Sequence, residues 1–252
     1  MNWAQQSNVN LFLVFGDNSV SLSVYSNHDK TFLAHQLFPL IASKSIAENC
    51  SSVWNRLPYQ RLDFSKIRVG ILANYSSIFP LQFENKTCED LFAFDFGLEK
   101  EDCLQLRIKS NSNHKIASML NPEIVEWCKS TFKTPEFFST TEIANNTSHN
   151  QTEKNTAHIY LYNNVFELLV KMDNEVVIQN KFDYNSTEDI TYYTLYSLDQ
   201  LDIERSELKF YLSSMTNDEA IDFELIKKFI DYQPMIENEK TPTIPFQLLL
   251  CE

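Results

Sequence analysis

Hydrophobic and polar positions in the first part of the chain predict three strands, a helix and a fourth strand, in that order. Val9–Phe15 is mostly apolar, residues 20–25 alternate apolar and polar side chains, and Thr31–Phe38 continues the strand pattern. Apolar side chains then recur at helical spacing, at Ile46, Cys50, Val53, Trp54 and Leu57. Ile67–Ala73 is apolar enough to be a central parallel strand. Further signals follow: a helix start at Thr87, a strand at Cys103–Ile108 and a helix start at Asn121-Pro122-Glu123.

The same order of patterns returns in the last part of the chain. Three strands are predicted at Ala157–Tyr162, Val165–Met172 and Glu175–Phe182, with tight turns at Asn163-Asn164 and Asp173-Asn174. The later elements are a helix that starts at Ser186, a strand at Leu208–Leu212, a helix capped by Asn217 and a closing strand at Ile244–Leu250.

This repeated order indicates a mixed α/β protein with two similar lobes. Three strands joined by hairpins and extended by a crossover helix to a parallel fourth strand form a ribonuclease-H-like unit, and two such units in tandem give the actin-like ATPase architecture. Between them, residues 140–156 contain one large apolar side chain, Ile143, which predicts a linker or exposed loop. The expected organisation is a first lobe at 1–140, a polar linker or loop at 141–156 and a second lobe at 157–252.

Composition narrows the classes of function. The chain has 252 residues with a net charge of −13 and only three glycines. An acidic chain lacks the basic face of a nucleic-acid binder, and so few glycines exclude the Walker and dinucleotide-binding loops. No apolar run is long enough to span a membrane and no signal peptide is evident, so we expect a cytoplasmic protein without membrane insertion. Five cysteines without a CxxC pair predict reduced thiols.

Charge is distributed unevenly between the two lobes. Residues 141–252 contain 8 basic and 20 acidic residues, whereas residues 1–140 are nearly neutral. The acidic second lobe is either simply solvated or a docking face for a basic partner segment.

Two segments resemble a bacterial family of unknown function that has an actin-like ATPase fold. They are Asn180–Tyr193, with the sequence NKFDYNSTEDITYY, and Phe79–Phe83, with the sequence FPLQF. The wider superfamily includes actin-like proteins of cell division and of type IV pilus assembly. The resemblance implies a nucleotide site with glycines in its phosphate and adenosine loops.

This chain departs from the implied nucleotide pattern at four places. The first-lobe turn has Gly16 before Asp17, rather than two positions after an acid, and the second-lobe turn has Asn163-Asn164. Asn180-Lys181-Phe182 stands where a Gly-Gly pair is expected, and the adenosine-side loop is Ser213-Ser214-Met215. If Mg-ATP binds, Asp17, Asn18, Ser19, Asn163 and Asn164 would hold it through their side chains.

No residue pattern points to catalysis or to a metal. The first strand of each lobe lacks the acid that a ribonuclease-H nuclease needs, and the five histidines lack ligand spacing. Asp17 is also an ordinary residue for a hairpin turn. We therefore expect no catalytic residue, no metal and no cofactor, although an unrecognised hydrolase or transferase site stays open.

Aromatic side chains are the remaining candidates. Phe182, Tyr184, Tyr192 and Tyr196 lie in or near the segment that starts the helix of the second lobe. They are either core residues or an exposed patch that binds an unidentified protein partner. The leading hypothesis is a protein-binding or scaffold module that lacks ATPase activity, and the alternative is a divergent ATP-binding actin-like ATPase.

Overall fold

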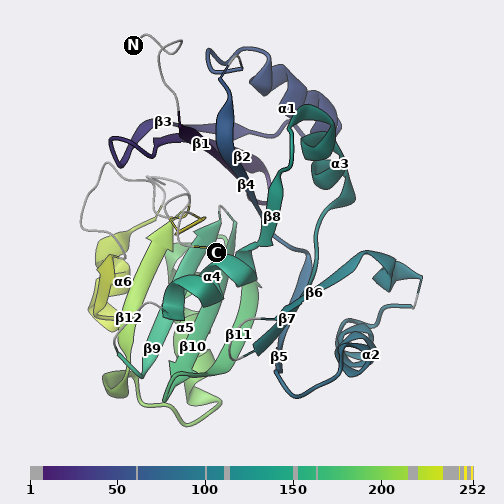
Figure 1. Cartoon of the computed structure of the whole chain (residues 1–252). Coiled ribbons are helices and arrows are strands. Elements are labelled where there is room, and N and C mark those ends of the chain that lie inside the picture. Colours follow the sequence, from purple (N-terminus) through teal and green to yellow (C-terminus); the bar gives the residue numbers. More distant parts are fainter. Residues whose placement is uncertain are drawn as a thin grey trace. The chain divides into compact units, whose positions relative to one another are not determined.

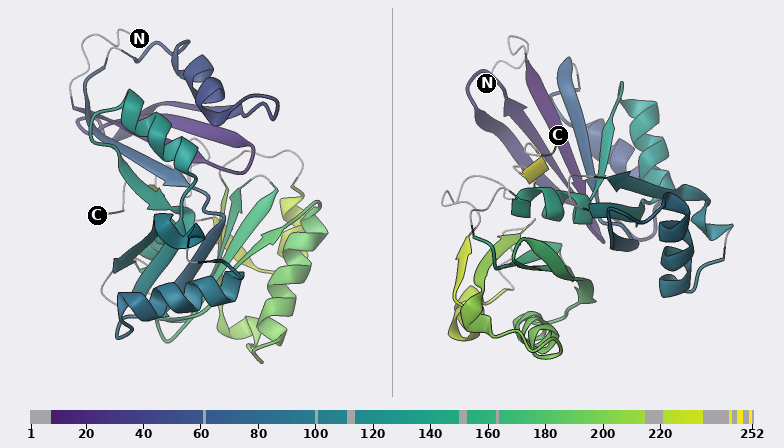
Figure 2. Two further views of the ribbon diagram at one scale, coloured as in Figure 1. Left: turned by 90° about the vertical axis from the view of Figure 1, so that its right-hand side faces the viewer. Right: turned by 60° about the horizontal axis from the view of Figure 1, so that its bottom comes forward.

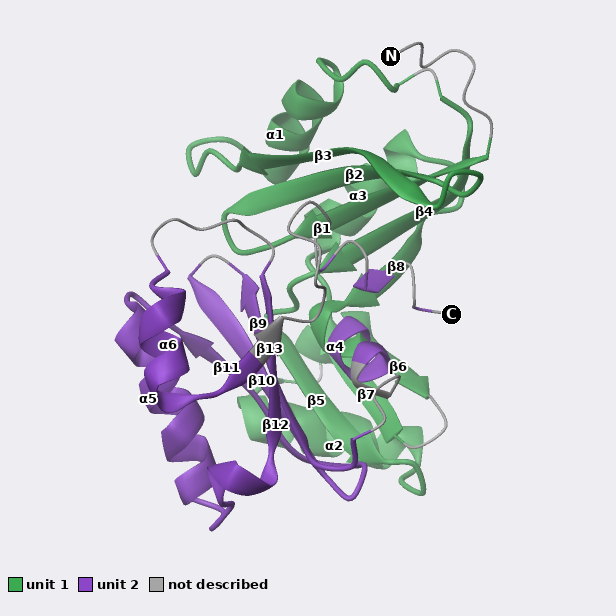
Figure 3. Cartoon of the chain, turned by 90° about the vertical axis from the view of Figure 1, so that its left-hand side faces the viewer, with its two compact units in different colours: residues 1–142 green, residues 143–252 purple. Residues whose placement is uncertain are grey.

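The structure, a computed structural model, describes residues 8–60, 62–99, 101–110, 114–149, 153–162, 164–214, 221–234, 244, 247–248 and 251. The chain divides into two compact units, Met1–Glu142 and Ile143–Glu252, which are coloured separately in Figure 3. Each unit contains its own five-stranded mixed sheet, and the first unit also carries a smaller, three-stranded sheet (Figure 1).

The sheet of the first unit has the strand order β3-β2-β1-β4-β8. β1 pairs antiparallel with β2 and parallel with β4, so the central strand is hydrogen-bonded on both sides. The elements are β1 (Val9–Phe15), β2 (Ser19–Ser26), β3 (Thr31–Pro39), α1 (Ile46–Trp54), β4 (Phe64–Ile71), α3 (Pro122–Thr131) and β8 (Glu136–Ser139).

The sheet of the second unit repeats this arrangement as β11-β10-β9-β12-β13. β9 again pairs antiparallel with one neighbour, β10, and parallel with the other, β12. The elements are β9 (Thr156–Tyr162), β10 (Val165–Met172), β11 (Glu175–Asp183), α5 (Thr187–Asp199), the 3₁₀ turn η3 (Arg205–Glu207), β12 (Lys209–Ser214), α6 (Phe223–Phe229) and β13 (Tyr232–Pro234). The predicted series of three strands, a helix, a strand and a helix is therefore confirmed in both units, but the edge strands β8 and β13 were not predicted.

Each sheet packs one face against a pair of helices. α1 contacts α3 in the first unit, and α5 contacts α6 in the second (Figure 2). Alternate residues of β1, such as Leu11 and Leu13, share the first core with Cys50 of α1 and Trp127 of α3. This is the burial that the period-two and helical patterns predict.

Local signals explain where the elements begin and turn. Ser45 and Ser186 each form a capping box at the start of α1 and α5, in which the side chain and backbone of residues three apart exchange hydrogen bonds. Asp173 and Asn174 both have positive φ, 52° and 69°, as a two-residue hairpin between β10 and β11 requires.

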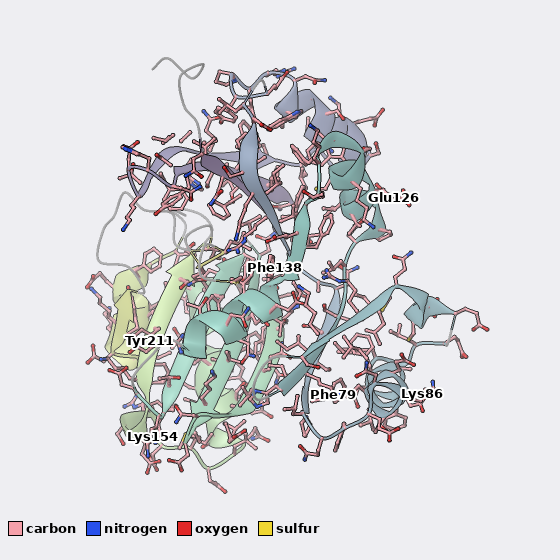
Figure 4. All side chains as sticks on the ribbon, in the orientation of Figure 1. Phe79, Lys86, Glu126, Phe138, Lys154 and Tyr211 are labelled. Carbon is pink, nitrogen blue, oxygen red and sulfur yellow. The ribbon has the colours of Figure 1, made fainter. Side chains whose placement is uncertain are left out.

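An inserted sheet interrupts the first unit between β4 and α3. Its strand order is β5-β7-β6, and its elements are β5 (Tyr75–Pro80), α2 (Asn85–Phe96), the 3₁₀ turn η2 (Asp102–Gln105), β6 (Leu106–Ser110) and β7 (His114–Met119). Phe92 of α2 packs with Phe79 of β5, which is labelled in Figure 4.

Two expectations for this insertion were wrong in detail. Cys103–Ile108 was predicted as one strand, but it is a 3₁₀ turn followed by the start of β6. α2 begins at Asn85 rather than at Thr87, and Glu84 at its N-cap makes no capping side-chain hydrogen bond.

Helix α4 (Thr140–His149) occupies most of the segment predicted to be a linker or exposed loop. Glu142 accepts a hydrogen bond from the Ser139 amide, at 3.2 Å, and its own amide donates to Ser139 Oγ, at 3.1 Å. Ile143 and Ala144 are buried. The helix was missed because its buried residues other than Ile143 are small or polar, so the sequence shows no apolar stripe.

Basic side chains of the inserted sheet hold the start of α4 within the first unit. Lys109 Nζ lies 3.1 Å from Glu142 Oε2 and donates to the Phe137 carbonyl oxygen, at 2.9 Å. Arg107 donates to the same carbonyl, at 3.1 Å. Lys109 also lies over the ring of Phe138 of β8, 4.3 Å from its centroid. Phe138 is labelled in Figure 4.

The C-terminal elements differ from the predictions. The predicted capping residue Asn217 lies outside the described residues, and α6 is capped by Asp222, whose side chain accepts from the Leu225 amide. Most of the predicted closing strand also lies outside the described residues, but Ile244, Gln247 and Leu248 are helical rather than extended. Through the described residues, no helix has the length and apolar character needed to cross a bilayer.

The contact between Lys109 and Glu142 predicts a measurable stability difference. Lys109→Met leaves the Glu142 carboxylate, whose side chain is 3% exposed, without its cation. We expect the free energy of unfolding to fall by about 1–3 kcal/mol and the amides of β6 and β7 to exchange faster. Urea unfolding and hydrogen exchange measure the two effects.

Lys86→Met is the matched control for this prediction. Lys86 pairs with Glu89 and Asp90 on the exposed surface of α2, so its loss is expected to lower the free energy of unfolding less than the loss of Lys109 does. Equal losses for the two variants would show that the buried contact does not anchor the inserted sheet.

Candidate functional site

The first predicted nucleotide-binding position is the turn between β1 and β2. Asp17 and Asn18 are exposed, and Ser19 is buried at the start of β2. The Gly16 amide donates to the Ser19 carbonyl oxygen, at 2.9 Å, and the Asn18 carbonyl oxygen accepts from the Leu40 amide, at 2.7 Å. Gly16 does not adopt positive φ. The turn is thus closed by backbone hydrogen bonds of its own unit, with no use of the conformational freedom of glycine.

The other predicted nucleotide-binding positions lie in the second unit. Asn163 and Met215 fall outside the described residues, and Asn164 is exposed with its carbonyl oxygen accepting from the Tyr184 amide, at 2.8 Å. Ser213, near the end of β12, is buried, and its Oγ accepts from Gln247 Nε2, at 2.9 Å. Asn164 and Ser213 thus also make hydrogen bonds within their own unit.

The segment where the superfamily glycines are expected is regular strand. Asn180, Lys181 and Phe182 of β11 pair in sequence with Leu168, Glu167 and Phe166 of β10. The pairing continues to Asp183, opposite Val165. No break in the strand provides the close backbone approach that a Gly-Gly pair would allow.

The predicted aromatic residues come together in the second unit as a continuous series of rings. Phe166 stacks on Phe182 with ring centroids 5.1 Å apart, and Phe182 stacks on Tyr193 at 5.1 Å with the planes only 8° apart. Tyr193 meets Tyr192 edge-on at 5.3 Å, and Tyr192 stacks on Tyr196 at 5.8 Å. The series therefore leads from the core to the surface of α5.

Exposure separates the four predicted partner-binding residues. Tyr192 is 60% exposed and Tyr196 is 49% exposed, whereas Phe182 is half-buried beneath Tyr193. Tyr184 is only 8% exposed and belongs to the core, so it does not form part of the surface. Sequence spacing placed Tyr192 and Tyr196 on one helical face, but it gave no information on the burial of Tyr184.

The exposed tyrosines lie on a face of α5 that we call the α5 stripe: Glu188, Tyr192, Tyr196 and Asp199. These positions recur every three or four residues, and all four are exposed. The capping box of Ser186 and Asp189 fixes the start of the helix. The stripe therefore presents two stacked phenol rings between two carboxylates on a well-anchored helix.

A second feature of this unit was missed from the sequence. The face of the sheet opposite α5 is lined by polar side chains, which we call the polar face: the buried Thr156, His158, Tyr160, Glu167, Lys171 and Tyr211 and the partly buried Lys181. His158 stacks on Tyr211, with centroids 4.9 Å apart, and Tyr160 donates to the Ala144 carbonyl oxygen, at 3.1 Å. Glu167 accepts from Gln179, at 3.0 Å.

Burial changes the protonation of this polar face. Desolvation lowers the pKa of His158 to about 3, and the neighbouring Lys171 cation adds to the effect. Burial also lowers the pKa of Lys171 to about 8. The signal in the sequence was the presence of Glu167 and Lys171 within an otherwise apolar strand, because a fully apolar environment would not accept them.

The described residues contain no group of histidine, cysteine and acidic side chains that could hold a metal ion. The cysteines among them are free thiols, and burial raises the pKa of Cys50 to about 12.

A family model described as a protein of unknown function, DUF3822, matches residues 1–232. The chain belongs to this family. The match confirms the resemblance to a family of unknown function. No curated protein matches the sequence.

Solved structures show the fold of this DUF3822 protein. A Bacteroides thetaiotaomicron protein with an actin-like ATPase fold and unknown function aligns over 100% of this chain and 99% of its own, with a TM-score of 0.77 and 18% identity. The PilM–PilN type IV pilus biogenesis complex contains a chain that aligns over 96% of this one and 97% of its own, with a TM-score of 0.63 and 11% identity.

A third similar structure is the cytoplasmic domain of EpsL, an inner-membrane component of the type II secretion system of Vibrio cholerae. It aligns over 96% of this chain and 93% of its own, with a TM-score of 0.55 and 9% identity. The predicted mixed α/β fold with actin-like architecture is confirmed.

The buried histidine predicts a pH dependence of stability. Because the pKa of His158 is about 3 when folded and about 6.5 when unfolded, the unfolded chain binds the extra proton between these values. The neutral His158 side chain makes its full contribution to the free energy of unfolding above pH 6.5. As the pH falls from 6.5 toward 3, this contribution decreases by up to about 1.4 kcal/mol per pH unit. His158→Phe, which keeps a ring beside Tyr211, is expected to remove this contribution.

Denaturant unfolding between pH 4 and pH 7 measures the effect as the difference between the wild-type and variant curves. His28→Phe is the control, because His28 is exposed. Parallel curves for the wild type and His158→Phe would contradict the prediction.

Proposed function

We propose that this protein is a protein-binding or scaffold module on the actin-like fold, that it does not hydrolyse ATP, and that it binds its partner through the α5 stripe. The observation that carries the proposal is the exposed, stacked pair of Tyr192 and Tyr196. Tyrosine is enriched at interface hot spots, because its large ring buries apolar area while its hydroxyl group remains able to hydrogen-bond.

The support beneath the two tyrosines favours a binding role. Tyr192 contacts Tyr193, and Tyr193 rests on Phe182 over the core. Rings held in this way lose little conformational freedom when a partner covers them, so more of the contact energy contributes to affinity.

The turns support the absence of ATP chemistry. Phosphate loops present several backbone amides to the anion, and glycine allows the close approach. In the first turn the Gly16 amide is already bonded to Ser19, and Asn164 of the second turn is not glycine. The alternative is Mg-ATP held by the side chains of Asp17, Asn18, Ser19, Asn163 and Asn164.

The similar proteins provide a precedent for binding on this fold. PilM occurs in a complex with PilN, and EpsL is a component of a secretion system. Both descriptions agree with a role in which a protein of this fold recruits another protein.

Mg-ATP titration tests the proposed lack of nucleotide binding. We expect no heat in calorimetry and no thermal shift at millimolar Mg-ATP. Binding with a micromolar Kd would stabilise the protein by about 2.7 kcal/mol at a hundredfold excess over Kd, which is readily detected. A shift that grows with ligand and disappears in Asp17→Ala would establish the ATP-binding alternative instead.

Affinity capture from cells that make the protein tests the binding role. Tyr192→Ala/Tyr196→Ala is expected to lose the captured partner while its stability changes by less than about 1 kcal/mol, because both rings are largely exposed. Phe94→Ala is the matched control, since Phe94 of α2 is an 83%-exposed aromatic residue of the first unit. If the tyrosine variant retains the captured partner and the Phe94 variant loses it, the partner binds at the inserted sheet and not at the α5 stripe.

A further inference from the structure

We propose that the segment bound at the α5 stripe is basic, and that its arginine side chains lie on Tyr192 and Tyr196 and pair with the carboxylates beside them. This inference rests on the proposed function, and it names the chemistry of the partner. Three observations on the second unit lead to it: the charge of α5, the open phenol rings and an acidic groove at the end of the helix.

The charge of α5 is entirely negative. Its sequence, TEDITYYTLYSLD, contains Glu188, Asp189 and Asp199 but no lysine or arginine. Asp189 is engaged in capping, since it accepts from the amides of Asn185 and Ser186 at 2.9 and 3.0 Å. Glu188 and Asp199 form no ion pair with the rest of the described chain. The stripe therefore has carboxylates at both ends without cations of its own.

The tyrosine rings between these carboxylates suit a cation. A guanidinium group over the face of an aromatic ring is attracted by the ring quadrupole, and arginine stacks on such a face better than lysine does. Tyr192 and Tyr196 are nearly parallel, with 14° between their planes. An uncharged apolar partner would use the rings but would leave the flanking carboxylates desolvated and unpaired.

An open groove of about 250 Å³ continues from the C-terminal end of the stripe. Its apolar residues are Leu195, Leu198 and Ile203, and three carboxylates line it, those of Asp199, Asp202 and Glu204. Asp199 belongs to both the stripe and the groove. Methylene groups of a long basic side chain fit the apolar part, while its charged end meets the carboxylates and the negative end of the α5 dipole.

The arginine that belongs to this groove, Arg205, does not take the place of a partner's basic side chain. Arg205 also lines the groove, but its Nη1 donates to the Phe229 carbonyl oxygen, at 3.0 Å, on the side of α6. The charge of the whole region agrees with a basic partner, because residues 141–252 contain 20 acidic and 8 basic residues. From the sequence alone a solvated acidic surface was the favoured interpretation and a basic partner the alternative, whereas the arrangement of rings and carboxylates on α5 supports the partner.

Binding of short synthetic peptides to the full chain tests the inference. The probes are fluorescent eight-residue peptides with alternating Arg and Ala, alternating Lys and Ala, or alternating Glu and Ala, measured by anisotropy at 150 mM salt. We expect the Arg peptide to bind most tightly, the Lys peptide more weakly and the Glu peptide not at all.

Two variants separate recognition by this surface from general attraction to an acidic protein. Tyr192→Ala/Tyr196→Ala keeps the net charge, and it is expected to weaken binding of the Arg peptide about fivefold or more. Asp199→Asn/Asp202→Asn/Glu204→Gln is expected to weaken it about tenfold or more. The matched control, Glu84→Gln/Glu99→Gln/Glu101→Gln, removes the same charge from exposed positions of the first unit and is expected to change binding less than about twofold.

The outcomes are distinguishable from those of the proposed function. If the tyrosine variant binds the Arg peptide as the wild type does, or if both triple variants weaken binding equally, attraction follows net charge alone and the inference is wrong. No binding of the Arg peptide also overturns it. If the tyrosine variant still loses its captured cellular partner in either case, the protein-binding function stands and only the basic chemistry of the partner falls.

Discussion

Each unit is organised around one central strand that is hydrogen-bonded along both sides and buried over its whole length. β1 lies between β2 and β4, and β9 lies between β10 and β12, with the same combination of antiparallel and parallel pairing. Because side chains alternate between the two faces of a sheet, this pairing decides which residues meet the helices and which meet the opposite side. A shift of one residue in β9 would bring His158 and Tyr160 into the apolar core and would place Ile159 and Leu161 among the charges of the polar face. The register of the central strands therefore determines both the cores and the position of α5.

The central strands also explain which parts of the fold the sequence predicts. A strand that packs one face on helices shows period two, and the helices above it show an apolar stripe, so the repeated order of strands and helices could be read in both halves. The inserted sheet was not predicted, because its strands are short and a single strand, at Cys103–Ile108, was expected in this region. α4 was missed because polar contacts such as Lys109 with Glu142 replace an apolar stripe. Of the predicted surface residues, helical spacing identified Tyr192 and Tyr196, but only the packing of the rings shows that Tyr184 is buried.

The scarcity of glycine has a structural consequence for the turns of this chain. Among the described residues, positive φ is adopted by several non-glycine residues, including Lys30, Asp173, Asn174 and Asp202. Asn and Asp tolerate this conformation better than most other residues do, so the hairpin after β10 forms without glycine. Glycine is used at positive φ at Gly97, which ends α2 in the left-handed conformation. Most of the described positive-φ positions are therefore occupied by residues other than glycine.

In the proposed binding role, helix α5 uses its two faces for different purposes. Ile190 and Leu198 face the core, and Tyr193 joins them through its stack on Phe182. The outer face contributes little to folding, because Tyr192 and Tyr196 are largely exposed and their carboxylate neighbours are solvated. Side chains of the outer face, where the proposed recognition takes place, are therefore different from those that stabilise the core, and they can change with little effect on the core. A capped helix that rests on stacked rings is already ordered before a partner arrives, so the rings need not lose freedom to bind, and a modest surface of two tyrosines and a few carboxylates can provide useful affinity.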